Sequence, residues 1–530
     1  MVRKYFIVFL VGLLAASCAQ VGTITGGDRD QFAPKPIALA VVPLNETTNF
    51  TANGVEIPFD EYFKLVNPIQ NIRIVPPHAT IKASVKNKTL TLTWKDTLES
   101  NTTYAIYLNN AIKDLNEGND TIIQYVFSTG PFLDTLSYSV AVLDAWSNLP
   151  NDECIVALYE LNSDKLVSLA QPSNGIAKLN YLHKGEYRAV AFQDENNDLN
   201  LQDYEKLGFP DGGTITIEEN TFDSIPFRIF EPKKNPEITT LNFIPPCSFI
   251  VATNNPIVAQ SEINKPLGSP RQNVSLYIDG ELRQPYEHDW FSDDSLMFYF
   301  DKPKQNSVEV VYNYETFSDT VNYRFKLKER EAPIVIKPTN SGTFSPSKNV
   351  SFSINGPIEG IDNAKISIVN PLDSTQTIEF ETKFYNSTFQ LVFDREIAES
   401  VLVSFEKGAV KTKCGNSEEA KAPIKLKSVD NYGALNVTVS EYKGSIIVIL
   451  LQRNKAVKTI SVKDVSNTIE FTELNPGDYT FKIVRDSNGN GKWDVGEYVT
   501  LTHPEEVDIY SKKIKVRAGW TIDVPLTPKY

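Results

Sequence analysis

PGDYTFKIVRDSNGNGKWDVGEYV, residues 476–499, is the stretch of sequence that decides the fold. An earlier stretch, GEYRAVAFQDENNDLNLQDYEKLGF at residues 185–209, follows the same plan: Gly, an acidic residue and Tyr, then an alternating run, then a loop rich in Asp and Asn that contains a Glu. Alternation of apolar and polar residues is typical of a β-strand. The two stretches, about 290 residues apart, therefore predict a repeated unit in which a strand leads into an acidic loop.

The rest of the chain also has the composition of β structure. Short alternating runs of Val, Ile, Thr, Tyr and Phe recur between turns that contain Pro and Gly. In the region after residue 32 they predict strands at 54–59, 72–75, 90–94, 103–108 and 122–128. The apolar run Ile446–Leu451 is too short to cross a membrane and predicts a buried strand. The expected fold class is therefore all-β, a tandem array of β-sandwiches.

The first residues predict export and lipid attachment. Arg3 and Lys4 precede the apolar run Tyr5–Ala16, and small residues then lead into Cys18. This order is typical of a signal peptide that is removed after export. The segment resembles a bacterial lipoprotein signal, although Ala15 stands where that signal usually has Leu. The resemblance implies that Cys18 becomes the first mature residue and carries acyl chains; the alternative is cleavage beside an incidental cysteine.

Four motifs occur in the order typical of the bacterial Ig-like domain first described in S-layer proteins. They are FDEYF at 59–63, LESNTTYAIYL at 98–108, DLNEGN at 114–119 and YVFSTG at 125–130. The two repeated stretches resemble prealbumin-like sandwiches of carboxypeptidase regulatory domains. Together with the start CAQVGTITGGDRD, residues 18–30, this architecture is similar to a lipoprotein family of Bacteroidota. The resemblance implies a cellular location and a domain architecture, and it implies little about activity.

These patterns divide the chain into seven segments. They are a signal peptide (1–17), a lipid-anchored tether (18–31), a bacterial Ig-like domain (32–130), a prealbumin-like sandwich with an acidic loop (131–232), a β-sandwich (233–331), an Ig-like β-sandwich (332–429) and a prealbumin-like sandwich with a calcium-type loop (430–530). Cys154, Cys247 and Cys414 fall in three different segments, so we expect no disulfide within a domain and interpret each thiol as a small buried side chain.

The later acidic loop fits the calcium pattern D-x-[DN]-x-[DN]-G-x₅-E. Calcium takes about six to eight oxygen ligands, and side chains at alternate loop positions supply them. The candidate ligands are Asp486, Asn488, Asn490, Lys492, Asp494 and Glu497. The earlier loop offers Asp194, Asn196, Asp198, Asn200, Gln202 and Glu205, but Leu199 replaces the glycine. The alternative for both loops is a solvated Asn/Asp turn. No flanking helices are expected, so the predicted calcium is structural.

A third pattern is the acceptor sequence of Bacteroidota O-glycosylation, Asp-[Ser/Thr] followed by a small aliphatic residue, Met or Thr. It occurs seven times, against about two expected from average composition, which predicts that several copies carry glycans. The acceptor residues are Thr97, Thr121, Thr135, Ser224, Ser295, Thr320 and Ser374. Structural roles of the same turns are the alternative for part of the excess.

Several function classes lack support in the sequence. The formal charge of −14 repels phosphate backbones, which excludes nucleic acid as a partner. Four scattered histidines and the absence of nucleophile motifs argue against an enzyme. Asp60-Glu61 is interpreted as a turn at a strand end, not as a catalytic pair. Aromatic residues offer a sugar-stacking platform, although their spacing fits core positions better. They are Trp290, Trp493, Trp520, Tyr286 and Phe291.

The sequence therefore predicts a non-enzymatic outer-membrane lipoprotein that acts as a scaffold or accessory subunit of an outer-membrane complex, in transport or barrel assembly. The expected partner is an outer-membrane β-barrel protein. The alternative is a surface glycan-binding or adhesion protein, and a hydrolase with an unrecognised site comes third. The sequence does not decide on which face of the outer membrane the protein lies, and we prefer the cell surface to the periplasmic face.

Overall fold

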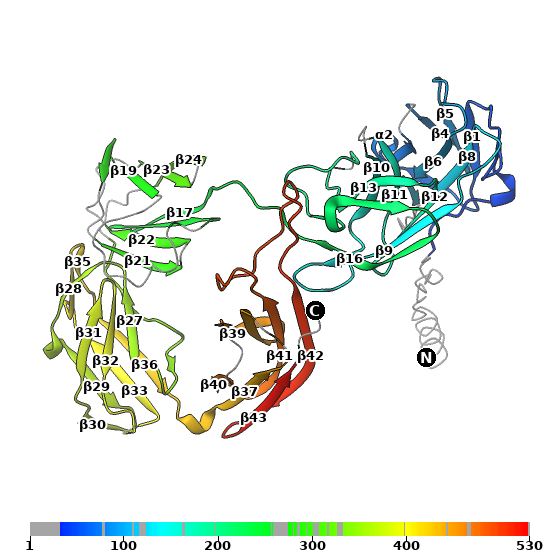
Figure 1. Ribbon diagram of the computed structural model, residues 1–530. Coiled ribbons are helices and arrows are strands. Elements are labelled where there is room, and N and C mark those ends of the chain that lie inside the picture. Colours follow the sequence, from blue (N-terminus) through cyan, green and yellow to red (C-terminus); the bar gives the residue numbers. More distant parts are fainter. Residues whose placement is uncertain are drawn as a thin grey trace, which may run out of the picture. The chain divides into compact units, whose positions relative to one another are not determined.

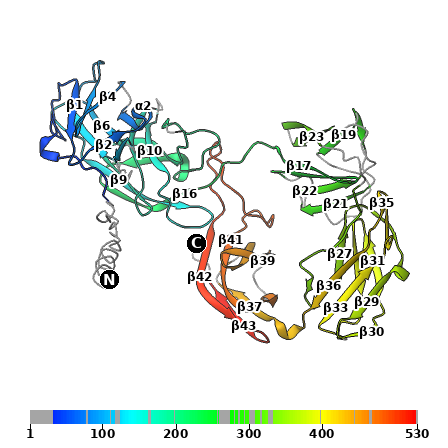
Figure 2. The same cartoon turned by 180° about the vertical axis from the view of Figure 1, so that it is seen from behind.

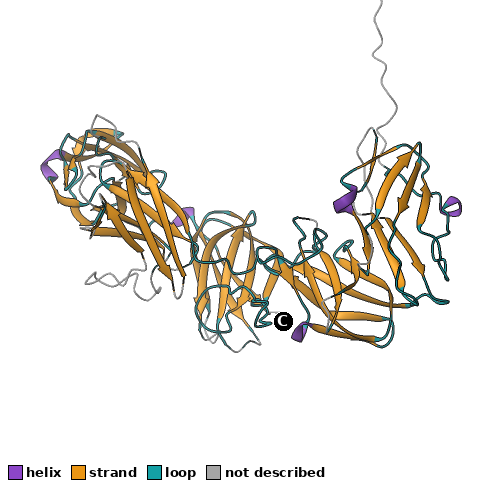
Figure 3. Cartoon of the chain, turned by 90° about the horizontal axis from the view of Figure 1, so that it is seen from above, coloured by secondary structure: helices purple, strands orange, loops and turns teal. Residues whose placement is uncertain are grey.

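The computed structural model describes residues 32–527, apart from 77–79, 109–110, 116–122, 162–164, 197, 256, 258–273, 279, 284–286, 293, 300–306, 315–316, 326–331, 397, 441, 443 and 464–467. Strands make up nearly all of the regular structure, and the helices are short turns (Figure 3). No described helix is long and apolar enough to span a membrane. The predicted all-β sandwich array is therefore confirmed, whereas the signal peptide, the tether and Cys18 lie outside the described residues.

The contacts divide the chain into two compact units. Met1–Leu143 and Pro150–Ile229 form the first, and Asp144–Leu149 and Phe230–Tyr530 form the second. Within the described residues, five main hydrophobic clusters follow one another along the chain, two in the first unit and three in the second. Each cluster fills one sandwich, so each sandwich has a core of its own.

The first sandwich has three sheets, in the orders β1-β5-β4, β2-β7 and β3-β6-β8. Its elements are the 3-10 turn η1 (Ala38–Ala40), β1 (Gly54–Pro58), β2 (Phe63–Leu65), α2 (Pro68–Asn71), β3 (Ile72–Val75), β4 (Lys82–Lys86), β5 (Thr89–Thr93), β6 (Thr103–Leu108), β7 (Ile112–Asp114) and β8 (Ile123–Ser128). Phe127 lies at the centre of the core, with its ring centroid 4.0 Å from that of Phe50 and 5.5 Å from that of Tyr104. The five strands predicted here are confirmed to within one residue at each end.

The second sandwich has two sheets, in the orders β11-β10-β13-β14, with β15 also paired to β13, and β12-β9-β16. Its elements are β9 (Leu136–Asp144), β10 (Ile155–Glu160), β11 (Leu166–Ala170), β12 (Ile176–Leu182), β13 (Gly185–Phe192), β14 (Leu207–Gly208), the 3-10 turn η2 (Asp211–Gly213), β15 (Thr214–Ile217) and β16 (Thr221–Ile229). The first repeated stretch forms β13 and the loop that follows it (Figure 1).

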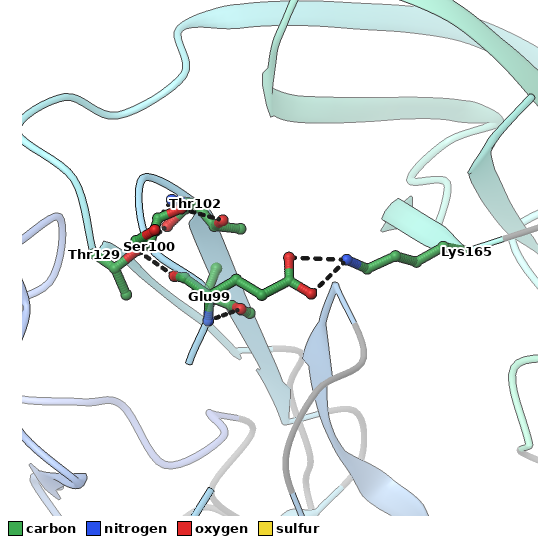
Figure 4. A network of polar contacts seen from close by, with 6 residues as sticks. Glu99, Ser100, Thr102, Thr129 and Lys165 are labelled. Carbon is green, nitrogen blue, oxygen red and sulfur yellow. Dashed lines mark hydrogen bonds and ion pairs between the residues drawn. The ribbon is translucent and has the colours of Figure 1, made fainter. Parts of the chain in front are cut away.

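Polar contacts join the first two sandwiches inside the first unit. The carboxylate of Glu99 forms an ion pair with Lys165, with Nζ–O distances of 3.2 and 3.1 Å (Figure 4). The backbone around Glu99 is held by the hydroxyls of Tyr104 and Thr129, at 3.0 and 2.7 Å. Burial raises the pKa of Tyr107, whose hydroxyl is hydrogen-bonded to Ser168 of the second sandwich. These contacts make the two sandwiches one body.

The third sandwich pairs two four-stranded sheets, β17-β18-β22-β21 and β20-β19-β23-β24. Its strands are β17 (Ile238–Ile244), β18 (Ser248–Thr253), β19 (Val274–Ile278), β20 (Glu281–Arg283), β21 (Glu287–Ser292), β22 (Ser295–Tyr299), β23 (Ser307–Tyr314) and β24 (Phe317–Arg324). Phe249, Phe298 and Tyr312 are fully buried between the sheets. Large aromatic side chains thus share this core with Val, Ile and Leu.

The fourth sandwich has sheets β25-β27-β32-β31, β26-β36-β33-β29-β30 and β28-β34-β35 (Figure 2). Its elements are β25 (Ile336–Pro338), β26 (Thr343–Phe344), β27 (Val350–Ile354), β28 (Ile358–Ile361), the 3-10 turn η4 (Asn363–Lys365), β29 (Ile366–Asn370), β30 (Asp373–Thr377), β31 (Glu381–Tyr385), β32 (Thr388–Val392), β33 (Ser400–Phe405), β34 (Val410–Thr412), β35 (Gly415–Asn416) and β36 (Ala420–Leu426). The rings of Phe352, Phe389 and Phe405 pack on one another at its centre.

The fifth sandwich repeats the strand order of the second. Its elements are the 3-10 turn η5 (Val429–Asn431), β37 (Gly433–Val439), β38 (Ile446–Gln452), β39 (Lys455–Val462), β40 (Ile469–Leu474), β41 (Gly477–Arg485), β42 (Val507–Val516) and β43 (Thr521–Leu526). β40 and β43 flank β37 as β12 and β16 flank β9, and β39 and β41 flank β38 as β11 and β13 flank β10. The predicted repeat is therefore confirmed, and the buried β38 contains the predicted strand Ile446–Leu451.

A tyrosine occupies the same place in both copies of the repeat. The Tyr187 hydroxyl donates to the carbonyl of His183 at 2.8 Å, and the Tyr479 hydroxyl donates to that of Asn475 at 2.7 Å. Each tyrosine is buried and reaches back four residues, so it ties the start of its strand to the preceding turn. The Gly-acid-Tyr motif of the sequence therefore has a structural role.

The cysteines differ from the sequence expectation. Cys154 is a buried free thiol, as expected, and burial raises its pKa to about 12. Cys247 and Cys414, however, form a disulfide bond. Interpreting these two thiols as small buried side chains was wrong, because the turns that carry them meet in the folded chain although they belong to different sandwiches.

Candidate functional site

The predicted calcium ligands of the later loop lie together after β41. The buried carboxylate of Asp486 accepts the backbone N–H groups of Asn490 and Gly491, at 3.0 and 2.9 Å. The Asp494 carboxylate accepts the side-chain amides of Asn488 and Asn490, at 2.5 and 2.8 Å. Three of the six predicted side chains, those of Asn488, Asn490 and Asp494, thus lie within hydrogen-bond distance, and Asp486 holds the turn through the backbone.

Glu505, which the sequence pattern did not identify, completes this loop. Its carboxylate oxygens accept the backbone N–H groups of Ser487 and Asp494, at 2.6 and 3.2 Å. Its backbone carbonyl accepts the indole N–H of Trp493 at 2.9 Å. Glu497, which the spacing predicted in the closing position, is exposed and accepts the hydroxyl of Thr500 at 2.7 Å instead. The loop is therefore closed by a different carboxylate from the one predicted.

The earlier loop has the same hydrogen bonds. Asp194 accepts the backbone N–H groups of Asp198 and Leu199, at 3.0 and 3.1 Å. Glu205 is fully buried, and its two carboxylate oxygens accept the N–H groups of Glu195 and Gln202, both at 2.9 Å. In this loop the closing carboxylate is the residue that the sequence pattern placed there.

Glu205 and Glu505 therefore hold equivalent positions in the two repeats. Each accepts the N–H of the second and of the ninth loop residue. The ninth residue precedes its closing glutamate by three positions in the earlier loop and by eleven in the later one, so the later loop has eight extra residues. This insertion explains why a fixed spacing selected Glu497, and the signal that identifies Glu505 is its alignment with Glu205 once the insertion is allowed.

Leu199 takes the backbone conformation of the glycine that it replaces. Its φ is 62°, and that of Gly491 is 78°. This left-handed conformation favours glycine, since a side chain there costs about 1–2 kcal/mol. Both loops nevertheless make the same turn, so the absence of glycine does not alter the geometry of the earlier loop.

The donor set of the later loop fits a weakly bound hard cation. The Asp494 carboxylate lies within hydrogen-bond distance of two side-chain amides, those of Asn488 and Asn490, and carboxylate and amide oxygens are the ligands that calcium prefers. Within the described residues, no group of three or more His, Cys, Asp or Glu side chains is placed to hold a metal ion. The set is therefore amide-rich, and a cation here would need water to complete its shell.

The earlier loop is richer in internal amide bonds. Gln202 and Asn196 both donate side-chain N–H groups to the Asp198 carboxylate, each at 3.0 Å. Asn200 donates to the carbonyl of Asp198 at 3.1 Å. The predicted ligands of this loop therefore also lie together, while the calcium prediction for both loops stays a prediction.

The side-chain pKa is raised in both closing glutamates, Glu505 and Glu205. Burial raises the pKa of Glu505, and the charges of Asp494 and Asp486 add to the rise, while its two backbone N–H donors oppose it. Burial likewise raises the pKa of Glu205, with Asp194 and Asp198 adding to the rise. A cation in either loop would offset the mutual repulsion of these carboxylates, so cation binding and protonation should compete.

The predicted glycan acceptors differ in accessibility. Thr97, Thr135, Ser224 and Thr320 are exposed, and Ser295 is half-buried. Ser374 lies in β30, and Thr121 lies outside the described residues.

The aspartates of these acceptor motifs also have structural contacts. Asp223, before Ser224, accepts the Tyr138 hydroxyl at 2.7 Å, and Asp319, before Thr320, accepts the N–H of Ile238 at 2.9 Å. Local structure therefore accounts for some of these aspartates, while the hydroxyls that follow them remain on the surface. The glycosylation prediction stays a prediction.

The aromatic residues considered for sugar stacking do not share one environment. Trp493 is half-buried, with its ring centroid 5.0 Å from that of Trp146. Trp520 is exposed, and the Arg517 guanidinium lies over its ring at 5.7 Å. Trp290 and Phe291 lie in β21, and Tyr286 lies outside the described residues. Trp493 thus serves packing, in agreement with the core interpretation of its spacing, whereas for the exposed Trp520 that interpretation was wrong.

Comparison with solved structures finds likenesses at very low identity. The Bacillus anthracis TIE protein is 10% identical over 95% of this chain and 76% of its own, with a TM-score of 0.13. The Bacteroides ovatus mixed-linkage glucan utilization locus SGBP-B, solved with a heptasaccharide, is 9% identical over 73% and 95%, with a TM-score of 0.22. The S-layer protein rSbsC is 12% identical over 89% and 67%, with a TM-score of 0.15. At these scores the likenesses carry no argument about function.

The comparison with protein families gives a match to one part of the chain, and the comparison with curated proteins gives none. No curated protein sequence matches the chain significantly. Residues 33–129 match a family described as the bacterial Ig-like domain. This match coincides with the first sandwich and confirms the Ig-like domain predicted at residues 32–130.

Proposed function

We propose that this chain is a lipid-anchored outer-membrane protein whose sandwiches form a scaffold or accessory subunit of an outer-membrane protein complex. The observation that carries the proposal is the series of sandwiches with separate cores, since such modules present broad sheet faces and edges to a partner. An outer-membrane β-barrel involved in transport or barrel assembly is the proposed partner. The proposed role is not enzymatic.

Two further features support a location outside the cytoplasm. The signal-like segment ends at Cys18, where acyl chains would hold the chain on a membrane. The Cys247–Cys414 disulfide is the kind of bond that persists in oxidising compartments. Acylation confines the array to a plane, which raises its effective concentration for any neighbour in the same membrane. Weak contacts can then give a stable complex.

The test of this function has two steps. In the first, Cys18→Ser should move the protein from the membrane fraction to the soluble fraction, because it removes the acyl chains. In the second, crosslinking of wild-type protein in intact membranes, followed by mass spectrometry, should recover one dominant β-barrel partner. Self-crosslinks alone, together with binding of purified protein to polysaccharide, would replace the scaffold by the surface glycan-binding alternative. Protease treatment of intact cells would then decide between the cell surface, which we favour, and the periplasmic face.

A structural calcium ion in the later acidic loop is part of the proposal. Its support is the contact of Asp494 with Asn488 and Asn490, in a turn whose backbone Asp486 holds. A bound cation would add oxygen contacts to a loop that is now held by amide donors. The earlier loop is proposed as a second site of the same kind.

A further inference from the structure

An apolar segment leads into the first sandwich, and most of its side chains lie outside the hydrophobic core. Residues 37–44, IALAVVPL, contain no charged or polar side chain. Only Val41 is buried, where it packs in the core of the sandwich. Leu39 is 93% exposed, Val42 62%, Leu44 52% and Ile37 45%. We call this segment, Ile37–Leu44, the apolar knob.

The backbone of the apolar knob is firmly held. The N–H of Ile37 donates to the carbonyl of Pro58 at 2.8 Å, and Val42 exchanges two hydrogen bonds with Glu56, at 2.9 and 2.8 Å. Between them, Ala38–Ala40 forms the 3-10 turn η1, closed by a 2.8 Å bond from the Ala40 N–H to the Ile37 carbonyl (Figure 1, dark blue). The exposed side chains are therefore presented by a fixed turn on the edge of β1.

The chemistry of the apolar knob favours lipid over a protein partner. Protein interfaces draw most of their affinity from Trp, Tyr and Arg, and the knob has none of these residues. It is an exposed turn of aliphatic side chains, which suits a fluid apolar layer. Its backbone N–H and C=O groups are only partly paired, so a shallow position at the level of the headgroups suits it better than deep insertion.

The position of the apolar knob in the sequence supplies the second argument. Ile37 lies nineteen residues after Cys18 in the chain. A chain of that length spans at most about 65 Å when fully extended, at about 3.3–3.6 Å per residue. The acylated cysteine proposed above would therefore keep the knob within reach of the bilayer that holds the lipid.

We infer that the apolar knob is a second, non-covalent membrane contact, in which Ile37, Leu39, Val42 and Leu44 dip into the lipid surface beside the acyl anchor. This inference rests on the proposed lipid anchor. The contact orients the first sandwich on the bilayer, and through the Glu99–Lys165 ion pair and its neighbours it orients the second sandwich as well.

Leu372 offers a matched control for the test. It is 94% exposed, on the turn between β29 and β30 of the fourth sandwich, so it equals Leu39 in residue type and in accessibility. Full-length acylated Leu39→Cys and Leu372→Cys variants would be labelled with an NBD maleimide. The label should go to the new thiol, because Cys154 is buried and Cys247 and Cys414 are bonded to each other.

The labelled proteins would be reconstituted into vesicles of phosphatidylethanolamine and phosphatidylglycerol, with and without a spin-labelled lipid. Flotation of the protein with the vesicles reports the anchor, and quenching by the spin-labelled lipid reports contact of each position with the bilayer. The inference predicts flotation of both variants and quenching at position 39 alone. Flotation without quenching at position 39, or equal quenching at both positions, would overturn it. Failure to float would show that the proposed anchor is wrong, and the inference would fall with it.

Discussion

Cys247 and Cys414 are joined by a disulfide bond across 167 residues of chain, with their Cα atoms 6.2 Å apart. Cys247 lies in the turn between β17 and β18, and Cys414 in the turn between β34 and β35. The side-chain amide of Asn355, in the fourth sandwich, donates to the carbonyl of Pro245 at 3.1 Å close to this bond. One covalent and one polar contact thus join two sandwiches that have separate cores.

The disulfide predicts a definite number of reactive thiols. Mature acylated protein, unfolded without reductant, should take up one maleimide, at Cys154, and after reduction it should take up three, at Cys154, Cys247 and Cys414. Intact-mass measurement counts the labels. Uptake of three labels without reductant would show that the bond is absent.

The same bond should contribute to stability. Replacing both bonded cysteines, in Cys247→Ala with Cys414→Ala, should lower the free energy of unfolding by about 2–5 kcal/mol, because the unfolded chain gains freedom when the crosslink is lost. Denaturant unfolding of the variant and of the wild type measures the difference. Reductant should destabilise the wild type and leave the double variant unchanged, which separates the bond from side-chain packing.

Calcium should stabilise the fifth sandwich through Asp486. Asp486→Ala should abolish the fall in melting temperature that chelation causes, because it removes the first predicted ligand and the acceptor of two backbone N–H groups of the loop. At a calcium concentration 100 times the dissociation constant, the folded state gains about 2.7 kcal/mol. Glu497→Ala is the control and should keep the calcium response, since its carboxylate contacts Thr500. A wild-type melting curve that ignores millimolar calcium would refute the site.

The calcium effect should also depend on pH. The pKa of Glu505 is raised, so its ionised form destabilises the folded state. This destabilisation is present above the raised pKa and is lost as the pH falls through it. Calcium should offset this cost only where the carboxylate is ionised. The difference in melting temperature between calcium and chelator should therefore be largest near neutral pH and shrink on acidification. A difference that is constant from pH 7.5 to 5 would contradict this coupling.

Glu505 and Glu497 form a matched pair for the loop closure itself. Glu505→Gln puts an amide group where two backbone N–H groups need acceptors, so it should cost about 1–3 kcal/mol. Glu497→Gln should change stability little, because this side chain is exposed. Thermal unfolding of both variants without calcium measures the two effects, and equal effects would mean that Glu505 does not close the loop.

Leu199 and Gly491, which both have a left-handed backbone conformation, should respond in opposite ways to substitution. Leu199→Gly should be neutral or should stabilise the second sandwich by up to about 1 kcal/mol, because it relieves a strained φ. Gly491→Ala should destabilise the fifth sandwich by about 1–2 kcal/mol. The added Cβ would lie 3.4 Å from Ser461, an ordinary contact, so the expected cost comes from the backbone. Chemical denaturation of the two single variants tests the pair, and a stabilising Gly491→Ala would contradict it.

Glycosylation should be found first at the exposed acceptors. Protein isolated from its native host should have an intact mass above that of peptide plus lipid, and the Thr97→Ala, Thr135→Ala, Ser224→Ala and Thr320→Ala variants should each remove one glycan mass. A native mass equal to that of peptide plus lipid would eliminate this prediction.

Local patterns were predictable from the sequence where the structure depends on neighbours in the chain. The strands of the first sandwich follow from alternation, and Asp486, Asn488 and Asn490 converge because an Asn/Asp-rich turn folds on itself. Glu505 was missed because eight inserted residues separate it from the loop that it closes. The disulfide was missed because its two turns meet only after two sandwiches have folded, which no local pattern encodes.

The parallel pairing of β37 with β43 also has a mechanical consequence. The first and last strands of the fifth sandwich run side by side in the same direction, with six residue pairs in register from Ala434 and Thr521 to Val439 and Leu526. Tension applied to the entering and leaving ends of this sandwich would pull the two strands past each other along their length. The hydrogen bonds between them would then bear the tension in shear and break together, unlike those of a hairpin, which unzip one at a time. A sandwich built in this way is suited to transmit a pull without opening.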